Sequence, residues 1–263
     1  MNATNDVLLV TIAERIALLT FNRPERRNAI SEELTAAVSE AILDADRNPD
    51  VSLIAVTGAG SAFCAGADLK NMRKKDEAAG ATTYRSPLHR TTRTMTEIMI
   101  DCKKPSLAII NGPAVAGGFE MALACDVRII ADTAFMAVPE SRRGMGAHLA
   151  SVVLPQTVPP AIAMEWLYTG RRITPAEAER WGLVNRIVPA ATLMDDAMAF
   201  ARDIVLSSPI SLQRMKQTFR KTTGMPLNAG LRLDTGPDPY ASEDRQEGIR
   251  AFLEGRKPVW RGR

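Results

Sequence analysis

The chain has 263 residues, of which 46% are hydrophobic and 24% charged, so it is long enough for one large domain with an appended part. Its net charge of +3 is too small to indicate nucleic-acid binding by itself and suits a small anionic substrate equally well. The three cysteines lack Cys-x-x-Cys spacing and only two histidines are present, which argues against a disulfide framework, a metal site and a Ser-His triad.

The N-terminal part predicts a β-hairpin followed by a helix. No basic leader and no run of about 18 apolar residues is present, so we expect no export signal or membrane span and a cytoplasmic protein. Residues 7–10 and 16–21 are β-rich runs that predict two paired strands. After a basic loop at residues 22–30, Ser31 is a candidate N-cap for an amphipathic helix that ends near Asp46.

The next elements are a buried strand, a loop of small residues and a polar stretch. Residues 53–56 predict the strand and residues 57–69 the loop, near whose end Asp68 could cap a helix. Residues 71–90 are polar, so we expect a mobile surface excursion there. Apolar residues at helical spacing predict a packed helix over residues 92–102.

The chain is organised around residues 111–126. A buried strand at residues 107–110 leads into a glycine-rich loop, and an apolar segment from Phe119 predicts a helix. Glycines let a ligand approach the backbone, and the free N–H groups of a first helical turn carry a partial positive charge that suits an oxyanion. Glu120 follows Gly117 by three residues, so a helix would aim its carboxylate at the same place. The alternative is that the glycines only permit tight packing and that Glu120 is a solvated first-turn acid.

Two glycine-containing loops resemble each other. Residues 52–58 lead to Cys64-Ala65-Gly66, and residues 106–112 lead to Val115-Ala116-Gly117. Such a weak repeat is expected if successive strand-strand-helix turns stack and bury one another's apolar faces. Two adjacent turns would then each offer a backbone amide. The alternative is that a strand, a small loop and a helix simply recur in α/β proteins.

A second acidic side chain follows two further strands. The strands are predicted over residues 127–131 and 133–138, and Glu140 stands at the end of the second. An acid beside arginines most often forms an ion pair, so we expect Arg142 or Arg143 to pair with Glu140.

Helices dominate the C-terminal part. The elements predicted there are helices that begin near Pro160 and Pro175, a strand over residues 184–188, and helices over residues 193–206, 210–222 and 243–254. The change from mixed α/β to all-α divides the chain into a core, residues 1–190, and a helical region, residues 191–263.

Several motifs occur in an order and spacing that is highly specific when they are taken together. They are Asn22-Arg23-Pro24 with Asn28-Ala29, Phe63-Cys64-Ala65-Gly66-Ala67-Asp68-Leu69-Lys70, Asn111-Gly112, Glu120 with Cys125-Asp126, Pro139-Glu140, Thr169-Gly170, Glu177-Ala178, Gly182-Leu183-Val184, and Glu247-Gly248 with Phe252. Together they resemble the crotonase family, the enoyl-CoA hydratase/isomerase group. The resemblance implies an α/β fold, a crotonase-like spiral of ββα repeats followed by a C-terminal helical trimerisation region.

The resemblance implies a hydro-lyase, an enoyl-CoA hydratase that adds water across the 2,3 double bond of an enoyl-CoA thioester. The backbone N–H groups of Ala67 and Gly117 would form the oxyanion hole that stabilises an enolate-like state. Glu120 would activate the water that adds at the β-carbon, and Glu140 would exchange the proton at the α-carbon. No metal or separate cofactor is implied, because coenzyme A is part of the substrate.

The family's coenzyme A site corresponds to two segments of this chain. The residues implied are Arg26, Ala29, Ala65, Ala67, Asp68, Leu69 and Lys70. Lys70 is the best candidate for a phosphate contact, and Arg26 is the second. The partners implied are an acyl-CoA substrate and further copies of the chain in a homotrimer or hexamer; neither nucleic acid nor a membrane is expected.

One departure from the family follows Glu140. Many hydratases of this family carry Pro-Gly-x-Gly-Gly there, whereas this chain has Ala147-His148-Leu149-Ala150-Ser151, so the shape of the acyl pocket does not carry over. Pairing with Arg142 or Arg143 would also lower the pKa of Glu140. The alternatives are an isomerase or other enolate chemistry in the same family, and a non-catalytic relative that binds acyl-CoA or RNA. The presence of both glutamates favours the hydratase.

Overall fold

The protein is built around a large mixed sheet. The structure, a computed structural model, describes residues 2–83 and 91–263. Within those residues the sheet has seven strands in the order β1-β2-β3-β4-β5-β7-β10. Their bounds are β1 Asn2–Asn5, β2 Leu8–Ala13, β3 Ile16–Phe21, β4 Leu53–Gly58, β5 Ser106–Ile110, β7 Val127–Ala131 and β10 Arg186–Val188. The first three strands pair antiparallel, and β3, β4, β5, β7 and β10 pair parallel. The predicted hairpin is therefore confirmed as β2 and β3.

A second layer of very short strands follows the main ones along the chain. It contains β6 (Ala114–Val115), β8 (Met136–Ala137) and β9 (Arg172–Ile173), and isolated bridges from Ile30 to Ala67 and from Cys64 to Ala114 extend it. The main strands β3, β4, β5 and β7 are thus each followed by a segment of this second layer and then by a helix. The repeat inferred from two loops is confirmed and extends over further turns of a ββα spiral.

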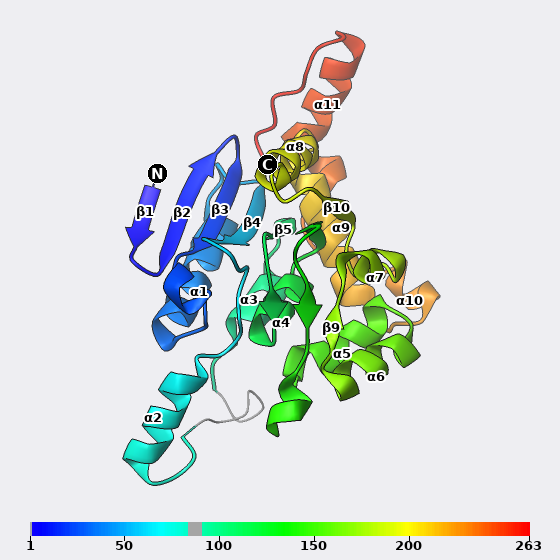
Figure 1. Cartoon of the computed structure of the whole chain (residues 1–263). Helices are drawn as coiled ribbons and strands as arrows, with labels where there is room; N and C mark the ends of the chain where they lie inside the picture. The colour runs from blue at the N-terminus through cyan, green and yellow to red at the C-terminus, as the bar shows by residue number, and fades with distance from the viewer. Residues whose placement is uncertain (1, 84–90) are drawn as a thin grey trace.

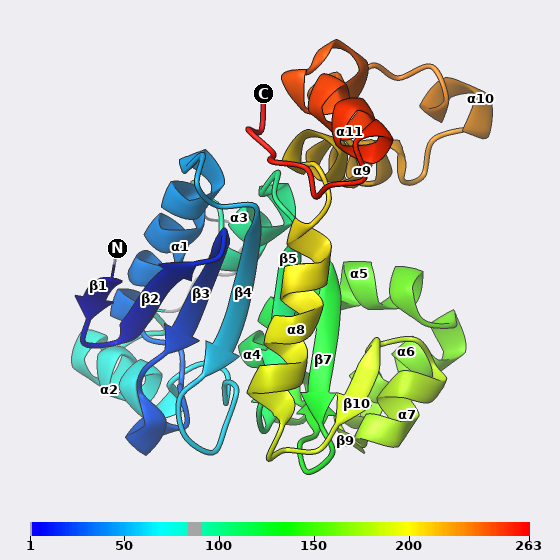
Figure 2. The same cartoon turned by 90° about the horizontal axis from the view of Figure 1, so that it is seen from above.

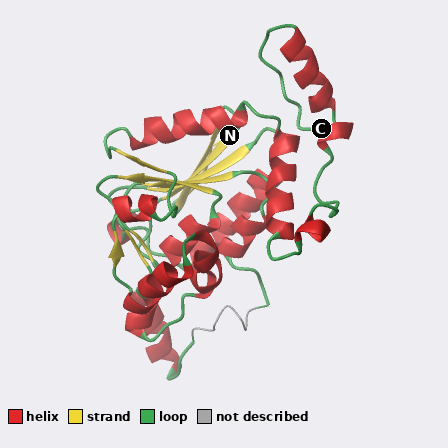
Figure 3. Ribbon diagram, turned by 90° about the vertical axis from the view of Figure 1, so that its right-hand side faces the viewer, coloured by secondary structure: helices red, strands yellow, loops and turns green. Residues whose placement is uncertain are grey.

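Helices cover both sides of the large sheet, as Figure 3 shows for the yellow strands between red helices. The helices are α1 Glu32–Arg47, α2 Leu69–Ala79, α3 Met95–Asp101, α4 Gly117–Ala124, α5 His148–Thr157, α6 Pro160–Thr169, α7 Pro175–Arg180, α8 Leu193–Val205, α9 Pro209–Thr222, α10 Leu227–Gly230 and α11 Glu243–Leu253, and the 3-10 turns are η1 Pro24–Arg26, η3 Glu140–Arg143 and η4 Pro239–Ala241. Helix α1 packs on β2 and β3, and α8 packs on β3, β4, β5 and β7. Figure 2 shows α8 lying over one face of the sheet, roughly along the strands, with α9 to α11 gathered beyond one end of the strands.

Local sequence explains several of these elements. Ser31 caps α1, because its hydroxyl accepts the Leu34 N–H at 3.2 Å, and the buried Leu34, Val38 and Ile42 line the face of α1 that meets the sheet. All six residues of β4 are buried, as expected for a central parallel strand. Cys64, Cys102 and Cys125 are free and buried.

One predicted segment and one helix differ from the expectations. The helix cap expected at Asp68 is confirmed, and the polar stretch after it is helical over residues 71–79, where it belongs to α2 at the lower left of Figure 1. The part of the predicted surface excursion on residues 84–90 lies outside the described residues. Helix α5 was not predicted. None of the helices in the described part of the chain has the length and apolarity needed to cross a membrane.

Candidate active site

The loops that follow β4 and β5 lie side by side at the carboxyl ends of these parallel strands. The Cys64 N–H donates to Pro113 O at 3.1 Å, and the Val115 N–H donates to Cys64 O at 2.9 Å. These bonds bring Gly66 against the start of α4, where a Cβ on Gly66 would lie 3.4 Å from Gly117 N. The two loops singled out as a repeat therefore meet at their glycines.

Two backbone amides are available at this meeting point. Within residues 2–83 and 91–263, the N–H groups of Ala67 and Gly117 donate no hydrogen bond. Ala67 is exposed and Gly117 is half-buried at the first position of α4, where amides have no partner within the helix. The turn into α4 passes through Ala116 at a φ of 54°, a conformation that costs free energy for a residue with a Cβ. The two amides therefore come from neighbouring repeats whose loops meet at Gly66 and the start of α4.

Glu120 is held against the start of α5 rather than being solvated. Its Oε1 accepts the Ala150 N–H at 3.0 Å. Burial raises the pKa of the Glu120 carboxyl, while the backbone N–H groups of Ala150 and Leu149 and the nearby His148 oppose that rise. The interpretation of Glu120 as an exposed first-turn acid is therefore wrong.

Glu140 is the more deeply buried of the two acids. It opens η3, it is 7% exposed, and its Oε2 has no hydrogen-bond partner among the described residues. Burial raises the pKa of Glu140 to about 7, and the charge of Glu120 contributes to the rise. A buried acceptor without a partner costs free energy, which is the situation expected of a group kept ready for a ligand.

The expected ion pair between Glu140 and its neighbouring arginines is wrong. The Arg142 Nε donates to Thr169 O, and the Arg143 Nη1 donates to Pro139 O at 3.3 Å. The η3 turn leaves both arginines exposed while it directs Glu140 inward. Arg143 opposes the rise in the Glu140 pKa only as its smallest contribution, so that pKa is raised and not lowered as expected.

The two acids therefore lie in different electrostatic surroundings. Burial raises the pKa of both carboxyls, but the N–H groups of Ala150 and Leu149 oppose the rise at Glu120, whereas the pKa of Glu140 rises to about 7. Repulsion between the two carboxylates separates their titrations further. Such a pair supplies a base and an acid at the same pH.

The segments expected to bind coenzyme A are joined beside Ala67. The Ala65 N–H donates to Arg27 O at 3.0 Å, and Asp68 forms a 3.6 Å ion pair with Arg23. The residues predicted there lie on these two segments: Arg26 in η1, Ala29 in the basic loop, Ala65 and Ala67 before α2, Asp68 at the N-cap of α2, and Leu69 and Lys70 in its first turn. Arg26, Leu69 and Lys70 are exposed, so their side chains are open to a ligand.

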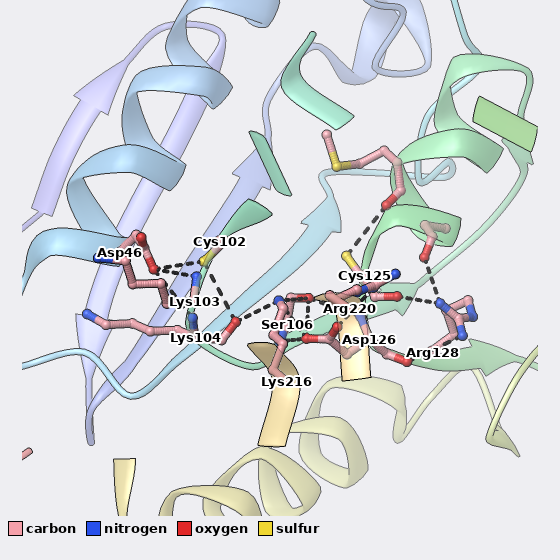
Figure 4. Close-up of polar contacts among 12 residues, drawn as sticks. Asp46, Cys102, Lys103, Lys104, Ser106, Cys125, Asp126, Arg128, Lys216 and Arg220 are labelled. Carbon is pink, nitrogen blue, oxygen red and sulfur yellow. Dashed lines mark hydrogen bonds and ion pairs between the residues drawn. The ribbon is translucent and has the colours of Figure 1, made fainter. Parts of the chain in front are cut away.

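The helix that carries Gly117 and Glu120 is anchored behind its C-terminal end, as Figure 4 shows. Asp126 accepts Ser106 N–H and Oγ–H at 2.9 Å each. It also pairs with Lys216 at 2.7 Å and Arg220 at 3.1 Å, both on α9. The C-terminal helices are therefore linked directly to the base of α4.

A buried arginine completes this anchor. Arg128 is 7% exposed, and its Nη1 donates to Ala122 O at 3.2 Å and to Cys125 O at 2.6 Å. These are carbonyls at the C-terminal end of α4, where a cation stabilises the helix. Within residues 2–83 and 91–263, no group of three or more His, Cys, Asp or Glu residues could hold a metal ion.

Comparison with known proteins gives the family. The family model for enoyl-CoA hydratase/isomerase matches residues 11–263. The chain belongs to the enoyl-CoA hydratase/isomerase family. Carnitinyl-CoA dehydratase from Salmonella paratyphi A is 39% identical over 253 residues, which cover 93% of this chain and 94% of the relative.

Solved structures of this family have the same fold. The enoyl-CoA hydratase from Mycobacterium tuberculosis H37Rv matches with a TM-score of 0.86 and 31% identity, over 98% of this chain and 100% of that one. A short chain enoyl-CoA hydratase described from Novosphingobium aromaticivorans matches with a TM-score of 0.83 and 32% identity, over 98% of both chains. These matches confirm the crotonase-like α/β fold and the enoyl-CoA hydratase/isomerase type of activity.

Sequence reasoning missed two contributors to the site. One is the N-terminus of α5, whose amides contact Glu120; Ala147 at its N-cap has no capping side chain, so no sequence signal marked the start of the helix. The other is Ile30, which contacts both loops that carry the free amides. Its position became apparent only when segments distant in sequence were brought together.

Proposed function

We propose that the protein is an enoyl-CoA hydratase that adds water reversibly across the 2,3 double bond of an enoyl-CoA thioester. The proposal is supported mainly by two carboxyls in different surroundings, Glu120 and Glu140, together with two amides that donate no hydrogen bond among the described residues. In this proposal the Glu120 carboxylate is the base and the Glu140 carboxyl is the acid, and the two amides bind the thioester oxygen.

In the hydration direction, the thioester oxygen accepts hydrogen bonds from the Ala67 and Gly117 N–H groups. The Glu120 carboxylate takes a proton from water as the water oxygen bonds to the β-carbon. Negative charge moves to the thioester oxygen, where each donor contributes up to ~3 kcal/mol to the transition state. Glu140 then gives its proton to the α-carbon. Dehydration is the same sequence in reverse and needs no other cofactor.

The coenzyme A part of the substrate is proposed to lie along the joined segments beside Ala67. Backbone groups of Ala29, Ala65, Asp68 and Leu69 would hold it, and the exposed Lys70 and Arg26 would meet its phosphates. Exposed lysine and arginine side chains suit this role because phosphates stay largely hydrated until the ligand binds.

The helical region 191–263 is proposed to assemble the chain into a trimer or hexamer, while residues 1–190 hold the site. Large apolar side chains are exposed on it: Met215 and Phe219 of α9 are 68% and 66% exposed, and Phe252 and Leu253 of α11 are 85% and 78% exposed. Exposure of several large apolar side chains in one region supports a contact surface there. Sedimentation of the purified chain tests the assembly.

The free cysteines suit a reducing cytoplasm, which is the location proposed for the protein.

A second candidate is dehydration of a 3-hydroxyacyl-CoA with a charged acyl group. The relatives named carnitinyl-CoA dehydratase favour it. The Ala147 to Ser151 segment departs from the Pro-Gly-x-Gly-Gly pattern of many hydratases, so the acyl pocket can differ from theirs. The same acids and amides would act, with Glu140 removing the α-proton. The isomerase and RNA-binding alternatives make no use of the water-activating role assigned to Glu120.

Product analysis tests the proposal. Purified protein is incubated with short and long 2-enoyl-CoAs, with 3-enoyl-CoAs and with carnitinyl-CoA, and products are identified by mass and chromatographic position. Gain of one water by a 2-enoyl-CoA, or its loss from a 3-hydroxyacyl-CoA, supports the hydro-lyase. A moved double bond without a change in mass supports the isomerase, and salt-dependent RNA retention without turnover supports the binding protein.

A further inference from the structure

The backbone of Ile30 brackets Ala67. The Ile30 N–H donates to Gly66 O at 2.8 Å, and the Asp68 N–H donates to Ile30 O at 3.1 Å. This is the parallel bridge between Ile30 and Ala67. In such a pairing the residue between the two bonded neighbours directs its own N–H to the opposite edge. Ile30 therefore fixes the direction of the free Ala67 N–H, which points away from it.

The side chain of Ile30 reaches the other amide. A Cβ on Gly117 would lie 2.7 Å from Ile30 Cδ1, and the Gly66 Cα would be its next neighbour at 4.0 Å. The isoleucine methyl thus occupies the space that a side chain at the first position of α4 would take. One residue holds Ala67 by its main chain and packs against Gly117 by its side chain.

Ile30 is itself held rigidly by the turn before it. Asn28 is fully buried with a φ of 54°, and its Nδ2 donates to Ala59 O at 2.9 Å and Ala62 O at 2.8 Å. Its Oδ1 accepts the Arg23 N–H at 2.9 Å. The turn is thereby tied to the loop that follows β4, which also carries Ala67.

An ion pair closes the arrangement on the other side of Ala67. The Arg23 guanidinium donates to Ala29 O and pairs with Asp68 Oδ2 at 3.6 Å, with both side chains mostly buried. The other oxygen of Asp68 accepts the Asn71 N–H at 3.2 Å and caps α2. Arg23 therefore links Ala29, which precedes Ile30, to Asp68, which follows Ala67.

We propose that Ile30 is a positioning residue that sets the separation and direction of the Ala67 and Gly117 N–H groups. The inference rests on the proposed function, because it assigns to those amides the thioester oxygen as their ligand. Shortening the Ile30 side chain leaves the bridge to Ala67 in place and frees the start of α4, so the two donors no longer converge. A displacement of this kind can cost on the order of 10- to 100-fold in rate.

Kinetics of Ile30→Val, Ile30→Ala and Ile30→Leu give the first readout. We expect kcat to fall progressively from Val to Ala, with KM for the acyl-CoA changed by less than about twofold, since the donors act mainly in the transition state. Leucine restores a terminal methyl and should recover most of kcat. Ile12→Val is the matched control, because Ile12 is also half-buried and packs on the core away from the site.

Infrared spectra of bound butyryl-CoA, labelled with carbon-13 at the thioester carbonyl, give a readout that needs no turnover. Two converging donors lower the carbonyl stretching frequency, so the wild-type protein and Ile12→Val should show the full shift and Ile30→Ala a smaller one. A full shift and full kcat in Ile30→Ala would overturn the positioning role while leaving the hydratase intact. If the wild-type protein binds butyryl-CoA without a shift, or does not bind it, the proposed function fails and the inference with it.

Discussion

The carboxylate of Glu120 lies at the N-terminus of α5, where its Oε1 accepts the Ala150 N–H at 3.0 Å. Ala147, the N-cap of α5, offers no capping side chain, so an acid from α4 satisfies one of the helix's free amides. The segment that departs from the family's glycine-rich pattern thus still supplies backbone donors. These donors oppose the rise in the pKa of Glu120, as the role of base proposed for it requires.

The rate should depend on pH through the acid pair. Only the singly protonated pair is active, because one acid must hold a proton and the other must lack one. We therefore expect kcat/KM to fall as pH rises through about 7, where Glu140 loses its proton. Hydration and dehydration should share this limb, since the overall equilibrium releases no proton. A kcat/KM that stays constant from mildly acid to clearly alkaline pH would contradict the assignment.

The burial of Glu140 should also appear in the stability of the fold. In the unfolded chain its carboxyl ionises near 4.5, whereas in the folded chain it resists ionisation up to about 7. The free energy of unfolding therefore falls by ~3 kcal/mol as pH rises from about 4.5 to about 7, and this carboxyl lowers it no further at higher pH. Denaturant unfolding of the wild-type protein and Glu140→Gln should show a stability difference that shifts in favour of the variant from acid to neutral pH. If the stability of the wild-type protein and of Glu140→Gln changed with pH in parallel, the raised pKa of Glu140 would be contradicted.

Adjacent glycines in α4 should respond differently to alanine. A Cβ on Gly118 would lie 2.2 Å from Cys64 O, a backbone atom, so Gly118→Ala should prevent normal folding. A Cβ on Gly117 would meet only the tip of the Ile30 side chain at 2.7 Å, so Gly117→Ala should fold but displace the amide. We expect a loss of roughly 10- to 100-fold in kcat for Gly117→Ala, in line with a misplaced oxyanion donor. Circular dichroism and kinetics of the two variants separate these effects.

The anchor behind α4 should stabilise the fold in a charge-dependent way. Burial opposes ionisation of Asp126, but Lys216 and Arg220 outweigh it and lower the pKa of Asp126 below 3.8. Asp126→Asn should cost ~3 kcal/mol at neutral pH, because it leaves the mostly buried Lys216 without its carboxylate. The cost should shrink as pH falls through the pKa of Asp126. Asp234→Asn, which breaks only an exposed pair with Arg214, should cost less than ~1 kcal/mol.

Much of the fold could be predicted from local sequence signals. Apolar runs located β4 and β5, and the capping residue Ser31 located the start of α1. Two-residue strands such as β6 have no periodicity to detect, and they form only because neighbouring repeats pair with them. Helix α5 carries Pro155 and lacks a capping side chain, so no local signal in the sequence indicated a helix there.

The site was only partly accessible from sequence. The positions of Ala67, Gly117, Glu120 and Glu140 were implied by motif resemblance, and their roles stay predictions. The ion pair expected of Glu140 was wrong, because adjacency in sequence does not decide which way a 3-10 turn directs each side chain. Burial of one acid and backbone capping of the other emerge only in three dimensions.

The roles proposed for the two acids are tested by the hydration rate of crotonyl-CoA, followed by loss of the enoyl-thioester absorbance, for the wild-type protein, Glu120→Gln and Glu140→Gln. Glutamine keeps the size of each side chain and, at position 120, an oxygen that can accept the Ala150 N–H. We expect hydration by the wild-type protein and a loss of ~10²- to 10⁴-fold in each variant, with acyl-CoA binding retained. Wild-type hydration that persists at near-normal rates in both variants would contradict these roles.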